Sequence, residues 1–236
     1  MEFRKRRVIQ ITCAALIAFG GSAQAATINM SLIQSAWGNV VIGNPNTLSG
    51  VGTNVITWNM PPVDGDHSAF HFDNAATLSM PTNTAFSLGE FTYFNYPAMG
   101  EDLDSADLYI NTVLNIDGTV VNANSMSVPF TLHPISGNCG NPNCNRDQIK
   151  LTGTQSIGTF NIGGMEYSLD IMGFLTDGKI KSVLHVFDND QSTASLMAEF
   201  RATAIPEPGT LGLLLAGFAG LAWNKRRSLA VRRQNH

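Results

Sequence analysis

Apolar and polar residues alternate in short runs along most of the chain. The clearest run has Leu or Ile at positions 108, 110, 114 and 116, with Tyr, Asn, Val and Asn at positions 109, 111, 113 and 115. Period-two alternation of this kind predicts a strand with one buried face. On the same basis we predict strands over residues 28–33, 38–42, 54–58, 86–94, 107–116, 127–133, 148–151, 156–162, 166–174, 181–187 and 195–202.

Turn residues separate these runs, and no window of about 12 residues in the middle of the chain shows convincing helical periodicity. Asp117-Gly118 and Asp177-Gly178 stand between apolar runs, as expected for two-residue hairpin turns, and Gly163-Gly164 is a third such pair. Many short strands separated by turns are typical of all-β sandwiches. We therefore predict one β-sandwich domain of jelly-roll type over residues 26–203.

The N-terminus has the three parts of a secretory signal peptide. Arg4-Lys5-Arg6-Arg7 is a basic start, residues 8–20 are apolar, and Ala23-Gln24-Ala25 is an A-x-A cleavage site. We predict that Ala23 and Ala25 mark the cleavage site and that residues 1–25 are removed, so that the mature chain begins at Ala26. A lipoprotein signal would need a cysteine just after the apolar part, whereas Cys13 lies inside it.

The C-terminal residues 204–236 form a second three-part signal. Pro206-Glu207-Pro208 precedes an uncharged apolar run over residues 211–223, and Lys225-Arg226-Arg227 follows it. As a helix this run would be ~20 Å long, which is short of the ~30 Å hydrocarbon core of a membrane. The basic cluster favours the cytoplasmic side. We interpret the tail as a short apolar helix suited to a processing signal, with a buried core helix as the alternative.

This layout resembles the PEP-CTERM protein-sorting signal of Gram-negative bacteria over residues 205–227. Ile205 stands where that family most often has Val. The resemblance implies an exosortase as processing partner, a membrane cysteine protease or transpeptidase that recognises Pro206, Glu207 and Pro208 as a substrate motif. It also implies a transient stage in the inner membrane, followed by the cell surface or the extracellular matrix.

The charge of the domain differs from that of the whole chain, whose formal net charge is −4. Both basic ends lie outside the domain, so residues 27–205 keep five Lys or Arg and sixteen Asp or Glu residues, a net charge of −11. Such a charge argues against binding to nucleic acid or to anionic lipid headgroups. It is compatible with divalent cations and with neutral or basic partners.

Cys139 and Cys144 are the only cysteines left once the signal peptide is removed, and they lie in a stretch rich in Gly, Asn and Pro. Export into an oxidising compartment predicts a disulfide between them. Two alternatives remain. A metal site would need two more ligands, for which His133 is the nearest candidate, and a redox-active pair would normally have C-x-x-C spacing.

Three acidic stretches are candidates for calcium, which prefers several carboxylate and carbonyl oxygens. They are residues 64–73, which include His67 and His71, residues 100–107, and residues 188–190. None has the spaced ligand pattern of an EF-hand loop. We predict solvated polar loops with no metal site and no cofactor, and we keep weak calcium binding as the alternative.

Aromatic residues offer a second candidate site. Trp58 and Tyr93, together with Trp37, Phe94 and Tyr96, are candidates for a sugar-stacking face, and the alternative is that Trp37 and Trp58 fill the core. Catalytic signatures are missing from the sequence: it has no G-x-S-x-G elbow, no H-E-x-x-H and no P-loop. Nothing among the sixteen acids selects one glycosidase pair over another. We therefore predict no catalytic residues and no enzymatic activity.

The stretch Thr92-Tyr93-Phe94-Asn95 resembles the Thr-His-x-Asn signature of the THxN family of PEP-CTERM cargo proteins, with Tyr93 in place of His. Residues 37–38, 86–89, 130–133, 148–151 and 167–174 also agree, so the resemblance covers most of residues 30–203. It implies no assigned activity. Because Tyr replaces His, the resemblance argues against a metal ligand or general base at position 93 and favours a packing or hydrogen-bonding role.

Two strong sorting signals around a domain without catalytic signatures point to a structural or adhesive protein of the surface or matrix, associated with exopolysaccharide. A carbohydrate-binding module is the first alternative, based on the jelly-roll pattern and the aromatic residues. A hydrolase or lyase acting on the producer's own polysaccharide is the second.

Overall fold

The computed structural model describes residues 26–59, 66–96, 102–135, 146–152 and 156–205, together with residues 212, 217 and 218. Within these residues the chain is built from antiparallel strands and one short 3₁₀ turn, η1 (Pro45–Thr47). The prediction of an all-β domain is confirmed. The jelly-roll assignment stays a prediction, and the apolar C-terminal helix lies, apart from three residues, outside the described part of the chain.

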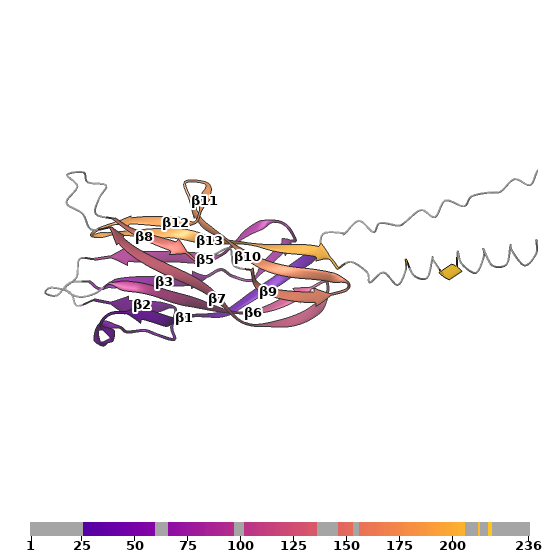
Figure 1. Cartoon of the computed structure of the whole chain (residues 1–236), viewed down its shortest axis with the longest axis horizontal. Coiled ribbons are helices and arrows are strands. Elements are labelled where there is room, and N and C mark those ends of the chain that lie inside the picture. The colour runs from indigo at the N-terminus through magenta and orange to yellow at the C-terminus, as the bar shows by residue number, and fades with distance from the viewer. Residues whose placement is uncertain are drawn as a thin grey trace, which may run out of the picture.

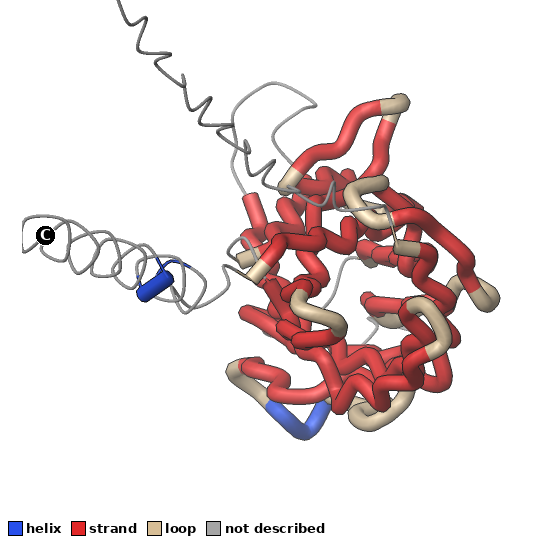
Figure 2. Tube along the Cα trace, turned by 90° about the vertical axis from the view of Figure 1, so that its right-hand side faces the viewer, coloured by secondary structure: helices blue, strands red, loops and turns tan. Residues whose placement is uncertain are grey.

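The strands form two sheets that curl around a common interior (Figures 1 and 2). The first sheet has six strands in the order β12 (Val183–Phe187), β8 (Arg146–Leu151), β7 (Thr119–Ile135), β6 (Leu103–Ile116), β1 (Thr27–Ile42) and β4 (Leu78–Pro81). The second has seven, in the order β11 (Lys179–Lys181), β10 (Met165–Thr176), β13 (Asp190–Ala204), β5 (Ala85–Asn95), β3 (Ser68–Asn74) and β2 (Val55–Trp58), with β9 (Ser156–Ile162) paired to β10.

Three hairpin turns lie where the sequence predicts them. Asp117 and Gly118 have φ of 48° and 89°, and Asp177 and Gly178 have φ of 53° and 71°. Two positive φ values in a row are the signature of the turn type that matches strand twist. Gly163-Gly164 closes the β9–β10 hairpin in the same way, with φ of 59° and 77°.

Several long strands contain a register shift near their middle, where the ribbons twist sharply (Figure 1). In the first sheet the shifts fall between Leu32 and Gln34 of β1 and between Ile110 and Thr112 of β6. In the second sheet they fall between Leu196 and Met197 of β13 and between Ile171 and Gly173 of β10. Bulges bend and twist a strand locally. We call this level the waist.

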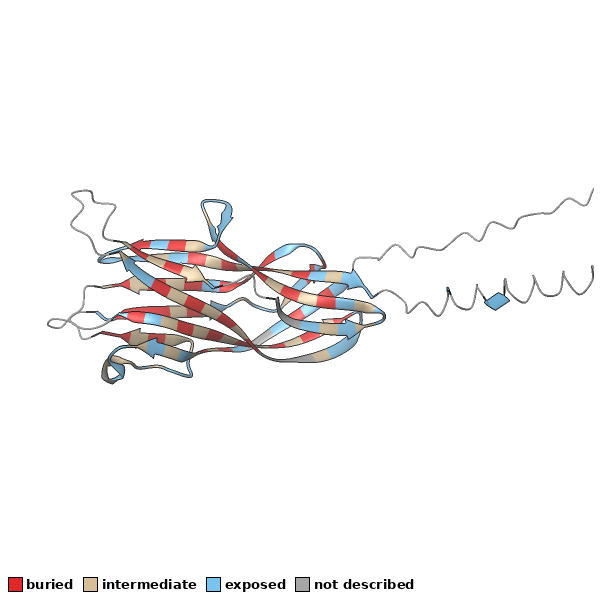
Figure 3. Ribbon diagram, viewed as in Figure 1, coloured by how far each residue is buried: buried red, intermediate tan, exposed pale blue. Residues whose placement is uncertain are grey.

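The waist divides one continuous buried core into two parts of different composition, and alternating burial along the strands marks both of them (Figure 3). On one side seven rings form a connected cluster, which we call the aromatic half: Trp37, Trp58, Phe70, Phe91, Tyr93, Phe130 and Phe174. On the other side lies what we call the aliphatic half, with the buried residues Ile28, Met30, Met80, Leu114, Ile116, Leu169 and the stacked pair Phe86 and Phe200. The described chain begins and ends at the far end of the aliphatic half (Figure 1).

The observed strands differ from the predicted ones in four places. Residues 28–33 and 38–42 belong to one strand, β1, and residues 181–187 are divided between β11 and β12. The prediction of a polar loop over residues 64–73 is wrong from Ser68 onward, because Ser68–Asn74 form β3. This strand buries Phe70 and Phe72 on one face and leaves His71 and Asp73 on the other. The strand β4 was also not predicted.

Candidate functional site

The stretch that resembles the THxN signature lies at the end of β5, in the aromatic half. Strand alternation places Tyr93 and Asn95 inward, with 1% and 6% of their surfaces exposed. Thr92 faces outward, and its hydroxyl lies 2.8 Å from the hydroxyl of Thr193 on β13. Two polar side chains therefore enter the space between the sheets at this end of the sandwich.

Tyr93 joins the two sheets through a hydrogen bond. Its phenolic hydroxyl, on the second sheet, donates to Oδ2 of Asp147 on β8 of the first sheet at 2.5 Å. Burial raises the pKa of Asp147 to about 6, while the hydrogen bond from Tyr93 acts in the opposite direction. Burial also raises the pKa of Tyr93, and the nearby Asp147 carboxylate adds to that shift. At neutral pH the pair is a neutral phenol bound to a carboxylate, which is a strong, charge-assisted hydrogen bond.

More carboxyl groups gather around this pair. Asn95 Nδ2 donates to Oδ1 of Asp188, in the β12–β13 turn, at 3.3 Å. Burial raises the pKa of Asp102, and the charges of Asp188 and Asp104 add to the effect. We call Tyr93, Asn95, Asp102, Asp147 and Asp188 the polar end. Among the described residues there is no group of three or more His, Cys, Asp or Glu side chains placed to hold a metal ion. Calcium binding stays a prediction.

The polar end continues into a network around Ser68, the first residue of β3. Asn59 Nδ2 donates to Ser68 Oγ at 3.0 Å, and Ser68 Oγ donates to the carbonyl of Tyr96 at 3.0 Å. His67 Nδ1 lies 2.7 Å from the carbonyl of Asn59. These contacts tie the ends of β2, β3 and β5 together. His67 therefore helps to order the ends of these strands.

Trp58 and Tyr93 do not form a sugar-stacking face. Trp58 is fully buried, and its ring stacks on Tyr93 with centroids 5.9 Å apart. Trp37 is also buried and contacts Phe70 and Phe130. Because ring faces packed in a core are closed to a ligand, the alternative interpretation is the correct one: these rings fill the sandwich. Of the candidate stacking residues, only Phe94 and Tyr96 form a stacked pair outside this cluster.

Three other predicted sites lie outside the described residues. Cys139 and Cys144 lie there, so the disulfide stays a prediction. The motif residues Pro206, Glu207 and Pro208 and the cleavage residues Ala23 and Ala25 also lie outside the described ranges. The last continuously described stretch ends at Ile205, whose amide donates to the carbonyl of Gly164 at 2.9 Å. No helix in the described ranges is long and apolar enough to cross a membrane.

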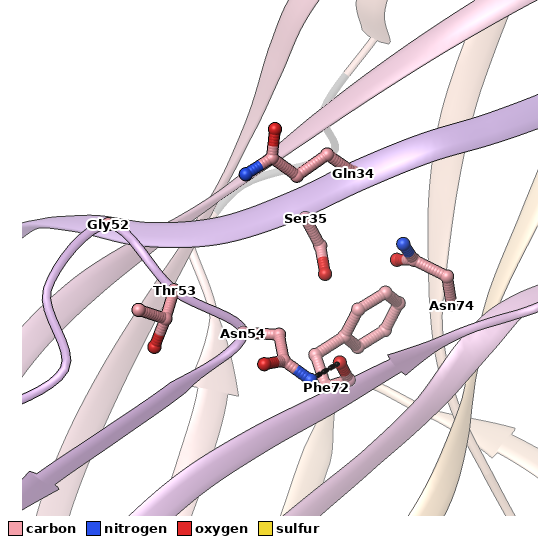
Figure 4. Close-up of a pocket in the computed structure, with 7 residues that line it drawn as sticks. All are labelled: Gln34, Ser35, Gly52, Thr53, Asn54, Phe72 and Asn74. Carbon is pink, nitrogen blue, oxygen red and sulfur yellow. Dashed lines mark hydrogen bonds between the residues drawn. The ribbon is translucent and has the colours of Figure 1, made fainter.

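A hollow of about 320 Å³ opens at the waist, between β1 and β3 (Figure 4). It is lined by Gln34, Ser35, Gly52, Thr53, Asn54, Phe72 and Asn74. A second hollow of about 400 Å³ lies beside the β10–β11 hairpin and contains the charged pair Asp177 and Lys181. Amide and hydroxyl groups dominate the first hollow, and it contains no charged side chain.

Asp147 and the residues of the first hollow were not predicted as site residues, and Asp188 was considered only as part of a candidate calcium loop. One local signal was present for two of them. Asp147 is in phase with the buried Ile149 on β8, and Ser35 is in phase with the buried Trp37 on β1. A polar residue at an inward position of a strand is informative because burying it costs free energy unless it finds a partner. The partner itself cannot be identified from the strand alone.

Comparison with known proteins is informative for the tail. No curated protein matches this chain at a significant level. The matched family range, residues 204–227, starts at the last residue of β13 and does not extend into the domain. The THxN resemblance therefore stays a prediction. Residues 204–227 match the PEP-CTERM protein-sorting motif, which implies an exported protein that an exosortase processes at the membrane on its way to the surface.

Proposed function

We propose that this protein is a non-enzymatic β-sandwich of the cell surface or extracellular matrix, with a structural or adhesive role in association with exopolysaccharide. The observation that carries the proposal is the PEP-CTERM motif, which begins where β13 ends. The domain is thereby attached directly to its sorting signal, without an intervening domain. A net charge of −11 over residues 27–205 supports a soluble exported body that does not bind nucleic acid.

The architecture supports a structural role. Several strands run most of the length of the body, β7 with 17 residues and β1 with 16. Their hydrogen bonds run between neighbouring strands along the whole sandwich, and the Tyr93–Asp147 bond links the two sheets at the end remote from the tail. A domain of this kind would extend away from the membrane while the sorting signal is held there.

The sorting part is tested by changing the motif alone. Glu207→Ala is expected to leave unprocessed chain in the inner-membrane fraction, because the motif is what the exosortase recognises. Deletion of residues 228–236, beyond the matched range, is the control and should leave processing normal. Mass spectrometry of both termini is the measurement. An unchanged mature C-terminus in Glu207→Ala would contradict the proposal.

The matrix part is tested separately, by fractionating cultures that produce the wild-type chain. We expect the mature protein in the exopolysaccharide fraction, from which enzymatic digestion of the polysaccharide should release it. Equal recovery in the culture fluid with and without digestion would contradict the matrix role while leaving the sorting result intact.

A carbohydrate-binding role is the second candidate. The observation that favours it is the uncharged hollow at the waist, with its amide and hydroxyl lining.

A further inference from the structure

The β-bulge in β1 gives the hollow its most unusual feature. Before the bulge the inward residues of β1 are even-numbered, Ile28 and Met30, and after it they are odd-numbered, Ser35 and Trp37. The shift between Leu32 and Gln34 therefore turns Ser35 toward the interior. Without the bulge, this position would face away from the second sheet.

Ser35 is buried with only 4% of its surface exposed, and its hydroxyl has no hydrogen-bond partner among the described residues. It points from β1 toward Phe72 on β3, across the hollow (Figure 4). A buried hydroxyl without a partner costs free energy, so natural structures usually supply a partner from the protein or from solvent. The unused group lies at the wall of a space large enough for a ligand and has almost no surface of its own open to solvent.

A rigid frame surrounds this hydroxyl. Trp37 Nε1 donates to the carbonyl of Asn54 at 3.0 Å, and Asn54 Nδ2 donates to the carbonyl of Phe72 at 3.3 Å. Asn54 Nδ2 also lies 3.2 Å from Nε2 of His71. These contacts fix Asn54 between the two sheets. The loop that carries Asn54 is also fixed, because the backbone of Trp37 forms hydrogen bonds with the backbone of Gly52 and Thr53.

Two further amides stand at the mouth of the hollow. Gln34 and Asn74 are exposed, and neither side chain has a hydrogen-bond partner within the described structure. A primary amide offers two donors and one acceptor oxygen, and a sugar hydroxyl both donates and accepts. The lining thus matches the hydrogen-bonding pattern of neighbouring hydroxyls. A carboxylate or phosphate would instead require a cationic partner, which this lining lacks.

We propose that this hollow, framed by Ser35, Asn54 and the Gln34 and Asn74 amides, binds one uncharged sugar unit of a polysaccharide. Its volume is at the lower end of the range for small-ligand sites, about 300–1,000 Å³, which fits a single sugar unit. This inference deepens the proposed matrix role and takes its biological meaning from it. Binding is nevertheless a property of the domain and does not depend on the sorting signal.

The test is a glycan array probed with the full chain, purified in a detergent without sugar groups. The array carries neutral oligosaccharides and oligosaccharides that contain uronic acids. We expect binding to a subset of the neutral glycans, and the free neutral monosaccharide of a bound glycan should compete in large excess. Titration calorimetry with the bound glycans then gives the affinity.

The variants separate this site from the rest of the surface. The double variant Gln34→Ala/Asn74→Ala should weaken binding about tenfold or more, since two hydrogen-bonding groups are removed. Ser35→Ala should weaken it about fivefold. The matched control is Asn161→Ala/Gln191→Ala, which removes an exposed Asn and an exposed Gln from β9 and β13 and should leave affinity within about twofold.

Three results would overturn the proposal: no neutral glycan bound, preference for the acidic glycans, or equal affinity of the double variant and the wild type. A failure of sorting in the Glu207→Ala strain would not affect any of these measurements, because they use purified chain. Conversely, loss of glycan binding would leave the sorting result unchanged. The two proposals therefore fail by different observations.

Discussion

The two halves of the sandwich use the same strands and are stabilised in different ways. In the aromatic half, connected rings fill the core and a polar end closes it. In the aliphatic half, Ile, Leu and Met side chains dominate the core, with one stacked ring pair. Aromatic side chains bury large areas and prefer specific mutual geometries. The difference suggests that one half provides a shaped, polar-capped end, whereas the other mainly anchors the body to its tail.

Phe91 at the centre of the aromatic half gives the largest expected effect. Its ring contacts Trp37, Phe70, Phe130 and Phe174, and it is fully buried. Phe91→Ala should lower the free energy of unfolding by about 3–5 kcal/mol. Phe86→Ala in the aliphatic half is the comparison, and we expect a smaller loss, because Phe86 is 9% exposed and contacts one ring, Phe200. Urea unfolding of both variants measures this, and an equal or larger loss for Phe86→Ala would show that the halves contribute alike.

The same replacement, Tyr by Phe, made once in each half tests the polar end. Tyr93→Phe removes the donor to the buried Asp147 carboxylate, so it should lower stability by about 1–3 kcal/mol at pH 7.5. Tyr167→Phe in the aliphatic half should change it by no more than about 0.5 kcal/mol, since no hydrogen bond of the Tyr167 hydroxyl is found in the described structure. The comparison uses urea unfolding at fixed pH. Equal effects would mean that the Tyr93–Asp147 bond adds little to stability.

The pH dependence of stability should also originate at the polar end. The pKa of Asp147 is raised from 3.8 to about 6 in the folded protein, so the fold binds a proton that the unfolded chain has released. The resulting stabilisation is complete below about pH 4 and is lost as the pH rises through about 6. The melting temperature should therefore decrease as the pH rises from 4 to 7.

Two variants check the assignment to Asp147. Asp147→Asn should flatten the change in melting temperature between pH 4 and pH 6. Tyr93→Phe should move its midpoint upward, because the hydrogen bond from Tyr93 lowers the pKa of Asp147. Asp102, whose pKa is also raised, should leave a smaller residual slope in the same direction. A pH profile that is identical in Asp147→Asn and in the wild type would rule Asp147 out.

Local sequence pattern predicted most strands because alternation and turn residues act over a few positions. The hairpin at Asp117-Gly118 is an example, since both residues needed for its positive φ values are adjacent in the sequence. The same pattern failed for β3. There, His71 and Asp73 occupy the outward positions, with His71 Nε2 at 3.0 Å from Oδ1 of Asp73, so the sequence of this stretch looks polar although Phe70 and Phe72 are buried.

The candidate sites were less predictable because they depend on contacts between the two sheets. Tyr93 and Asp147 are 54 positions apart, and nothing in either strand indicates the other. The hollow at the waist depends on a bulge, which changes which residues of β1 face inward. A period-two pattern with one extra residue looks like two strands, and residues 28–33 and 38–42 were predicted as two for this reason.

The smallest expected effect concerns two buried hydroxyls at the waist, Ser35 and Thr112, neither of which has a hydrogen-bond partner within the described part of the chain. Thr112→Val exchanges the hydroxyl for a methyl group of similar shape and should raise stability by about 1 kcal/mol. Ser35→Ala should change stability by no more than about 0.5 kcal/mol, because the small gap left beside the hollow offsets the gain from removing the unpartnered hydroxyl. Urea unfolding of the two variants measures the difference. An equal gain for Ser35→Ala would show that the gap beside the hollow costs no stability and that the two unpartnered hydroxyls are equivalent.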